Sequence, residues 1–89
     1  MITEGEKIFN FEIKVKLKEG ILDPQGNATL KVLKRLNFSV EEVRFGKSVN
    51  LKIKEENFEK AKQKAEQIAY EVLSNPVLED YEIMELDEE

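Results

Sequence analysis

Between Ile8 and Lys18 the sequence alternates between apolar and polar residues. The apolar positions are Phe9, Phe11, Ile13, Val15 and Leu17, and the polar positions are Asn10, Glu12, Lys14, Lys16 and Lys18. Successive side chains of a β-strand point to opposite faces, so a period of two places each kind of side chain on its own face. The segment therefore predicts a strand with one buried face and one face in water.

A first helix is predicted to begin at Asp23-Pro24. Aspartate can accept a hydrogen bond as an N-cap, and the fixed φ of proline suits the first helical position. Apolar residues then recur at helical spacing, at Ala28, Leu30, Val32, Leu33 and Leu36. Asn37 is expected to end this helix in a left-handed conformation.

A second helix is predicted to begin after Asn57 and to stop at Asn75-Pro76, because proline disfavours helical geometry in the residue before it. Its apolar face consists of Phe58, Ala61, Ala65, Ile68, Ala69 and Val72. A final strand is expected from about Leu78 to Leu86.

Two short alternating runs separate the helices, the first with Val43 and Phe45 and the second with Val49, Leu51 and Ile53. Gly46-Lys47 lies between the runs and predicts the turn of a β-hairpin. The resulting order is β-α-β-β-α-β. It indicates a ferredoxin-like α+β fold, with an antiparallel sheet and both helices on one face. We expect residues 1–7 to be a flexible leader, 8–86 a single domain and 87–89 an acidic tail.

The sequence contains no cysteine and no histidine. This excludes disulfides, thiolate or imidazole metal sites, and nucleophiles that depend on a histidine base. Carboxylates remain, but a catalytic pair of acids needs a buried cleft, for which a domain of this size seldom has room. We expect no catalytic, cofactor-binding or metal-binding residues. The net charge of −5 argues against nucleic acid and anionic membranes as partners. No apolar run approaches the roughly 20 residues that cross a bilayer.

Self-association is expected on grounds of size, because a chain of 89 residues supports only a modest core. The polar face of the predicted sheet is one candidate surface. Its cations are Lys14, Lys16, Lys18, Arg44, Lys52 and Lys54, and the last strand adds Glu82, Met84 and Leu86. Repulsion between neighbouring cations is destabilising, so carboxylates such as Glu82 should offset them. An ordinary solvated face and a partner-binding face both fit this pattern.

The predicted turns hold the other candidate residues. Asp23-Pro24-Gln25-Gly26 has a structural explanation as the turn into a helix, and Asn75-Pro76 has one as a helix stop. Arg44 and Lys47 flank Gly46 and could bind an anion or a partner carboxylate, since arginine offers a planar fork of donors.

Three segments together resemble the PurS family, an accessory subunit of formylglycinamide ribonucleotide amidotransferase. The segments are LKEGILDPQG at 17–26, VRFGK at 43–47 and NPVLEDY at 75–81. Each contributes several particular residues in the right order, and the resemblance spans about residues 8–84. Asn37 stands where the family often has glycine, a change that a left-handed cap tolerates.

The resemblance implies a non-catalytic, cytoplasmic subunit in the fourth step of purine synthesis. There, formylglycinamide ribonucleotide, ATP and glutamine give formylglycinamidine ribonucleotide. It implies a dimer or higher homo-oligomer that bridges the PurL synthetase and the PurQ glutaminase and supports ammonia transfer, with ATP and Mg in the synthetase. By analogy, the residues that shape partner contacts are Asp23, Pro24, Gln25, Gly26, Arg44, Gly46, Lys47, Asn75, Pro76 and Tyr81.

Other functions share the predicted topology. A ligand-sensing module of the ACT type has the same order and also works as a dimer. An acylphosphatase-like enzyme needs an arginine in a phosphate-binding loop after the first strand, and residues 18–27 contain none. An RNA-binding platform needs aromatic side chains on the exposed strand face, and this sequence lacks them there.

Overall fold

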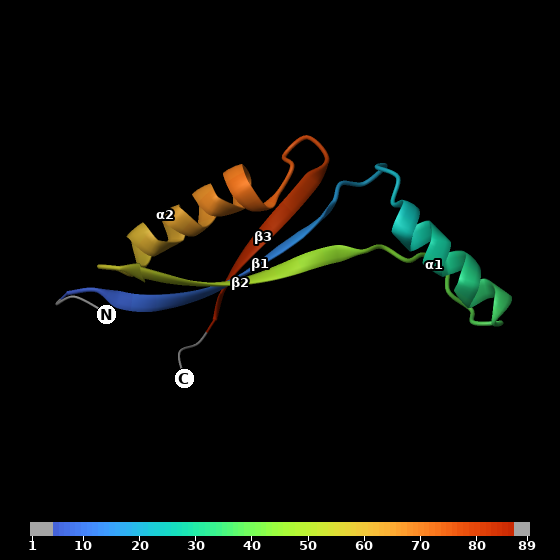
Figure 1. Ribbon diagram of the computed structural model, residues 1–89, viewed down its shortest axis with the longest axis horizontal. Helices are drawn as coiled ribbons and strands as arrows, with labels where there is room; N and C mark the ends of the chain where they lie inside the picture. The colour runs from blue at the N-terminus through green and yellow to red at the C-terminus, as the bar shows by residue number, and fades with distance from the viewer. Residues whose placement is uncertain (1–4, 87–89) are drawn as a thin grey trace.

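The computed structural model of the chain describes residues 5–86. Its elements, in order, are β1 (Lys7–Leu17), α1 (Pro24–Arg35), β2 (Gly46–Glu55), α2 (Phe58–Ile68), the π-helical turn η1 (Ala69–Leu73) and β3 (Glu79–Leu86). Figure 1 shows one sheet, with α2 lying across it and α1 standing apart at the far end of the molecule. Residues 1–4 of the expected leader and the expected tail, residues 87–89, lie outside the described residues.

The sheet has the order β2-β1-β3, and both pairings are antiparallel. Central strand β1 is the segment in which the alternation predicted a half-buried strand. In its register, Ile13 lies opposite Val49 of β2 and Ile83 of β3, so the apolar faces of all three strands coincide. The predicted alternation is confirmed in this strand.

Helix α2 covers the apolar face of the sheet. Phe11, Ile13 and Val15 of β1 are at most 2% exposed, and three alanines of the helical segment, Ala61, Ala65 and Ala69, are fully buried against them. Alanine leaves room for the helix backbone to approach the strands, while burial of each large side chain contributes about 1.5–3 kcal/mol. The core therefore lies between β1 and α2.

An aromatic cluster closes one end of this core. The ring of Phe58, at the first position of α2, lies 6.0 Å from that of Phe11 and 6.3 Å from that of Phe9. The Asn57 side chain accepts a hydrogen bond from the Lys60 N–H at 2.9 Å, which confirms the predicted N-cap.

The expected α+β class, with an antiparallel sheet and two helices, is confirmed, but the hairpin at Gly46-Lys47 is wrong. Gly46 is the first residue of β2 and pairs with Lys16 of β1. Gly46 and Lys47 lie inside one continuous strand, so the chain does not turn back there, and the Phe45 N–H donates to the Asp23 side chain instead of to a neighbouring strand. The described part of the chain therefore has three strands where the sequence predicted four.

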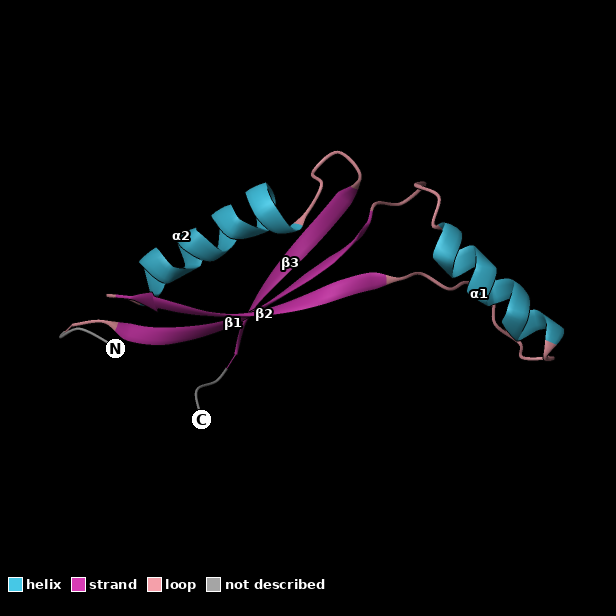
Figure 2. Cartoon of the chain, viewed as in Figure 1, coloured by secondary structure: helices cyan, strands magenta, loops and turns pink. Residues whose placement is uncertain are grey.

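The position of α1 also differs from the prediction that both helices cover one face. In Figure 2, both connections at the end of the sheet lead away to α1, which projects as an arm. The molecule measures 58 × 30 × 17 Å as a result. In the portion that is described, neither cluster of buried residues includes a residue of α1. The helical period predicted an apolar face correctly, but it could not show what that face would contact.

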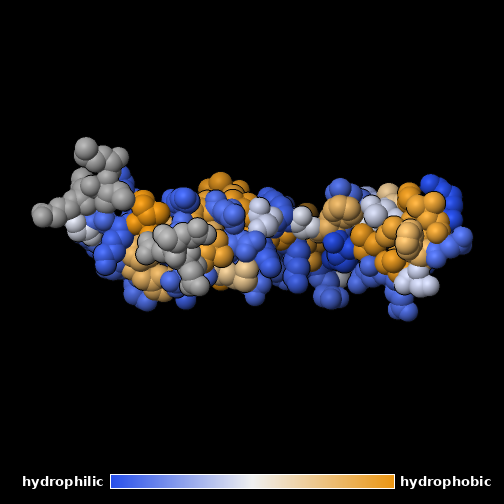
Figure 3. Space-filling model, turned by 90° about the horizontal axis from the view of Figure 1, so that it is seen from below, coloured by the Kyte–Doolittle hydropathy of each residue, from blue (hydrophilic) through white to orange (hydrophobic). Residues whose placement is uncertain are grey.

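Several apolar side chains in α1 and beside its ends are exposed to solvent. The exposed fractions are 69% for Leu22, 41% for Val32, 59% for Leu36 and 58% for Phe38. Figure 3 shows hydrophobic residues gathered at this end of the molecule. Within the described residues, no helix is long and apolar enough to cross a membrane.

Candidate functional site

Most of the residues singled out by the sequence lie where the arm joins the sheet. This junction consists of residues 17–26 and 43–47, which are the two chain connections beside the ends of β1 and β2. Pro24 and Gln25 are exposed at the start of α1, and Lys47 is exposed on β2 opposite Val15. The junction therefore unites two of the three segments that the sequence identified separately.

Asp23 joins the two connections through its carboxylate. The side chain is 6% exposed, and the backbone is extended at φ −115°, as an N-cap requires. One oxygen accepts the Gly26 N–H at 2.9 Å, and the other accepts the Phe45 N–H at 2.8 Å. The predicted cap is confirmed, while the bond to Phe45 was not visible in the sequence.

The surroundings of Asp23 favour its ionised form. The Phe45 N–H, and after it the Gly26 N–H, lower the pKa of the carboxyl below its ordinary value. Partial burial opposes this effect, and the positive charge of Arg44 adds to it. The carboxylate is thus held charged at the meeting point of two connections.

Position 26 requires glycine because the backbone of the other connection passes close to it. A Cβ atom added at this position would lie 2.1 Å from the Val43 carbonyl oxygen and 2.7 Å from an oxygen of Asp23. Neither the backbone carbonyl nor the bonded carboxylate is free to move away. The Asp-Pro-Gln-Gly turn is therefore shaped both by the start of α1 and by the chain that passes beside it.

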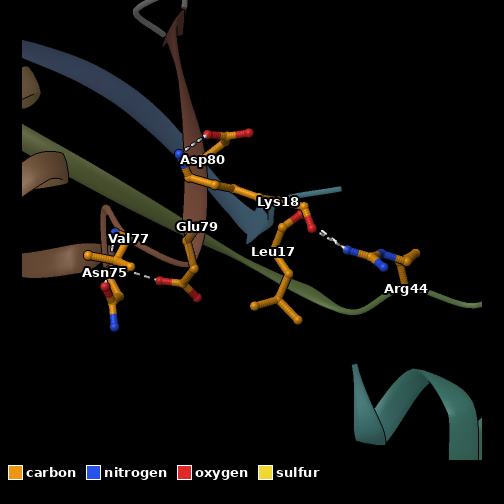
Figure 4. A network of polar contacts seen from close by, with 7 residues as sticks. All are labelled: Leu17, Lys18, Arg44, Asn75, Val77, Glu79 and Asp80. Carbon is orange, nitrogen blue, oxygen red and sulfur yellow. Dashed lines mark hydrogen bonds and ion pairs between the residues drawn. The ribbon is translucent and has the colours of Figure 1, made fainter. Parts of the chain in front are cut away.

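Arg44 crosses from the second connection to the first. Its Nη1 donates to the carbonyl of Ile21 at 3.3 Å, and its Nη2 donates to those of Leu17 and Lys18 at 3.2 and 3.1 Å. Figure 4 shows the guanidinium directed at the end of β1. The sequence left Arg44 as a possible ligand for an anion or a partner carboxylate, and it gave no sign that the guanidinium binds three carbonyls of its own chain.

The second group of predicted residues consists of Asn75, Pro76 and Tyr81. Asn75 makes hydrogen bonds within the turn that leads from the helical segment to β3. The side-chain oxygen of Asn75 accepts a hydrogen bond from the Val77 N–H, and the backbone N–H of Asn75 donates to the Glu79 carboxylate at 2.7 Å (Figure 4). The Leu78 carbonyl accepts the Lys18 N–H at 2.9 Å, which attaches this turn to the end of β1. Both predicted groups therefore meet at the same end of the sheet.

Tyr81 and Pro76 lie near this second group. Tyr81 pairs with Val15 and packs half-buried against the core, so its ring supports the sheet. Pro76 lines a shallow hollow with Lys18 and Tyr81. A proline stop was predicted here, but helical structure already ends at Leu73, where the Ser74 hydroxyl and N–H both donate to the Ala69 carbonyl.

A hollow of about 710 Å³ opens beside the junction. Its charged lining residues are Lys14, Lys16, Arg44, Lys47, Glu19, Glu42 and Asp80. The strand register places Glu82 opposite Lys14 and Asp80 opposite Lys16, so carboxylates offset these cations as the sequence predicted. A surface with interleaved charges suits contact with a polar protein surface better than capture of a free anion. Residues 5–86 contain no cluster of side chains that could hold a metal ion.

The fold and the junction define a class: a small α+β protein whose three-stranded antiparallel sheet carries a projecting helical arm. The family model for PurS, phosphoribosylformylglycinamidine (FGAM) synthase, matches residues 10–87. The chain therefore belongs to the PurS family.

Individual relatives agree with this assignment. The PurS subunit of phosphoribosylformylglycinamidine synthase from Thermotoga maritima is 38% identical over 80 residues, which cover 89% of this chain and 98% of that protein. The subunit from Methanocaldococcus jannaschii is 36% identical over 77 residues, with coverage of 85% and 93%.

Solved structures share the whole fold. The crystal structure of the T. maritima PurS subunit matches with a TM-score of 0.82 at 36% identity, over 91% of this chain and 94% of that one. A matching chain in the structure of PurLQS from T. maritima gives a TM-score of 0.83 at 37% identity, over 90% and 99%. The projecting arm is thus part of a fold found in experimental structures.

Proposed function

We propose that this chain is the non-catalytic accessory subunit of a formylglycinamide ribonucleotide amidotransferase, where it bridges a PurL-type synthetase and a PurQ-type glutaminase and supports ammonia transfer. The likeness to a chain of the T. maritima PurLQS structure carries the proposal, because it extends over 90% of this chain. In this proposal ATP and Mg bind to the synthetase, and the complex works in the cytoplasm.

The ten residues predicted to shape partner contacts remain part of the proposal. Both of their groups lie at the end of the sheet that bears the arm, and the charged hollow lies beside them. Here Asp23, Gly26 and Arg44 act by shaping the junction, whereas exposed residues such as Gln25 and Lys47 are available for direct contact.

We also infer that two copies associate through the exposed apolar face of the arm. Leu22, Val32, Leu36 and Phe38, in α1 and beside its ends, are each 41–69% exposed, and a second copy could cover them. Burial of this surface against a second copy would add to the modest core between β1 and α2.

Reconstitution tests the subunit role. The purified chain is mixed with the synthetase and glutaminase of its source, and amidation of formylglycinamide ribonucleotide is measured with glutamine as nitrogen donor. We expect glutamine-dependent turnover to require the chain. Turnover with ammonium as donor serves as a control that the synthetase is competent. Failure of the chain to stimulate two competent enzymes would reject the proposal.

A charge reversal tests the contact surface. Lys47→Glu alters an exposed cation at the junction, and we expect it to reduce rescue of glutamine-dependent turnover. Lys52→Glu makes the same change on the same strand but away from the junction, and should rescue normally. Equal rescue by both variants would remove Lys47 from the contact surface.

A further inference from the structure

Two hydrogen-bonding groups cross between the connections of the arm in opposite directions. Asp23 belongs to the connection that follows β1, and its carboxylate binds the Phe45 N–H just before β2. Arg44 belongs to the connection that precedes β2, and its guanidinium binds carbonyls of the connection that follows β1. We call this reciprocal pair the clasp.

We propose that the clasp of Asp23 and Arg44 sets the direction of the α1 arm relative to the sheet, and so positions the exposed face of the arm. The use of that face for assembly rests on the proposed function. The hydrogen bonds of the clasp themselves lie within one chain.

The need for such a device follows from the packing. Buried side chains fix α2 against the sheet, but in residues 5–86 no residue of α1 belongs to either buried cluster. Without core contacts, two covalent connections would leave the arm free to swing. The bonds that cross between the connections supply the missing constraint, and each involves a charged group, which makes it stronger than a neutral hydrogen bond.

The chemistry of both residues matches this task. A carboxylate has two oxygens, so Asp23 can cap α1 with one and hold Phe45 with the other. A guanidinium is a planar fork with several donors, so Arg44 can reach three carbonyls at once, whereas lysine would offer a single point charge. The contact between Gly26 and the Val43 carbonyl brings the two connections close enough for these bonds to form.

Substitutions at Asp23 can separate the clasp from the helix cap. Asparagine and serine cap helices about as well as aspartate. In Asp23→Asn, however, either the amide NH₂ faces the Phe45 N–H, donor against donor, or the cap is lost. In Asp23→Ser one oxygen replaces the two separately placed carboxylate oxygens, so it can serve the cap while the bond from the Phe45 N–H to the second oxygen is lost. Both variants should therefore retain α1 and weaken its attachment.

The direction of the arm can be measured by electron–electron resonance between two spin labels. The chain has no cysteine, so Lys34→Cys on the arm and Lys62→Cys on α2 provide labelling sites at two exposed positions. Labelled chain is diluted with an excess of unlabelled chain, so that only distances within one chain are recorded. The clasp predicts a single narrow distance distribution for the otherwise native chain.

We expect Asp23→Asn, Asp23→Ser, Arg44→Gln and Arg44→Lys each to broaden this distribution and shift its mean. Lys47→Gln, a neighbouring change outside the clasp, should leave it unchanged. Circular dichroism of the same samples checks that the helices persist. Unchanged distributions in folded clasp variants would overturn the proposal. Loss of the whole fold would also overturn it, because the two groups would then act in folding and not in setting direction.

The outcomes for the clasp and for the subunit role remain separable. The distance measurement uses this chain without the synthetase or the glutaminase, while reconstitution uses all three proteins. A native chain that fails to rescue turnover rejects the subunit role and leaves the clasp standing. Unaltered arm distances in the clasp variants reject the clasp, whatever the rescue shows.

Discussion

Asp23 and Gly26 each meet one constraint from α1 and a second one from the neighbouring connection. Asp23 was predicted as an N-cap and one of its carboxylate oxygens caps α1, while the second oxygen accepts a hydrogen bond from the Phe45 N–H. Gly26 reads as part of a turn, yet the Val43 carbonyl leaves no room for a side chain there. Both extra constraints come from residues about 20 positions further along the chain.

Acidification should weaken the fold through Asp23. Its pKa is lower in the folded chain than in the unfolded chain, so the stabilisation is fully present above the ordinary pKa of about 3.9 and is lost as the pH falls through the folded value. Urea unfolding gives the free energy of unfolding at neutral and at acidic pH. We expect this free energy to fall more on acidification for the native chain than for Asp23→Asn.

Comparison of the native chain with Asp23→Asn removes the contribution that other carboxyl groups make to the pH dependence of stability. Glu55 also has a lowered pKa, caused first by its hydrogen bond with Lys64, but this group is present in both proteins. Equal acid sensitivity of the two proteins would show that Asp23 does not make the expected contribution.

Gly26→Ala should destabilise the chain by about 1–3 kcal/mol, because the new methyl group meets a backbone carbonyl that cannot easily move. The neighbouring change Gln25→Ala alters an exposed side chain and should stay within about 0.5 kcal/mol of the native chain. Chemical denaturation gives both values. If Gly26→Ala is as stable as Gln25→Ala, the connections are not held as closely as the structure shows.

At the scale of elements, sequence patterns predicted those parts that depend on local periodicity. The alternation around Ile13 predicted a half-buried strand, which is β1, and Asn57 marked the start of α2. Asn37, with φ 70°, adopts the left-handed conformation that was predicted after α1. These features depend on few neighbours, so residue type and spacing determine them.

The parts that could not be predicted depend on contacts between distant segments. The alternation of Val43 and Phe45 resembles a strand, but the Phe45 N–H is taken by the carboxylate of Asp23, which is 22 positions earlier in the chain. The bonds of Arg44 depend on where the Leu17 and Lys18 carbonyls lie in space. No spacing in the sequence encodes that position, so these hydrogen bonds could not be predicted.

Packing of α2 on the sheet should tolerate little extra volume at its buried alanines. Ala65→Leu adds a large side chain at a fully buried position and should cost about 1–3 kcal/mol of stability. Gln63→Leu places the same side chain on the exposed side of α2 and should change stability by about 0.5 kcal/mol or less. Thermal unfolding checks both variants, and similar melting temperatures would contradict the close packing.

At the scale of the whole molecule, the chain is extended for its length. The radius of gyration is 17.5 Å, whereas a compact domain of this length should have a value of about 12 Å. The difference arises from the arm, which adds length without adding to the core. An isolated chain of this shape exposes apolar surface that a second protein can cover.

Self-association should therefore depend on the arm. Leu36→Glu places a charge on the exposed apolar face, and we expect it to shift the association equilibrium toward the monomer with little change in fold. Asn27→Glu introduces the same charge on the opposite side of α1 and should not do so. Sedimentation equilibrium measures the effect. Unchanged association of Leu36→Glu would exclude this face as the interface between copies.

The length of the arm gives the junction mechanical leverage. A helix of 12 residues is about 18 Å long, so a rotation of only about 10° where it is attached carries the far end through about 3 Å. Such a displacement is close to the length of a hydrogen bond. Small adjustments of a few backbone contacts can therefore decide whether groups at the tip meet or miss their counterparts.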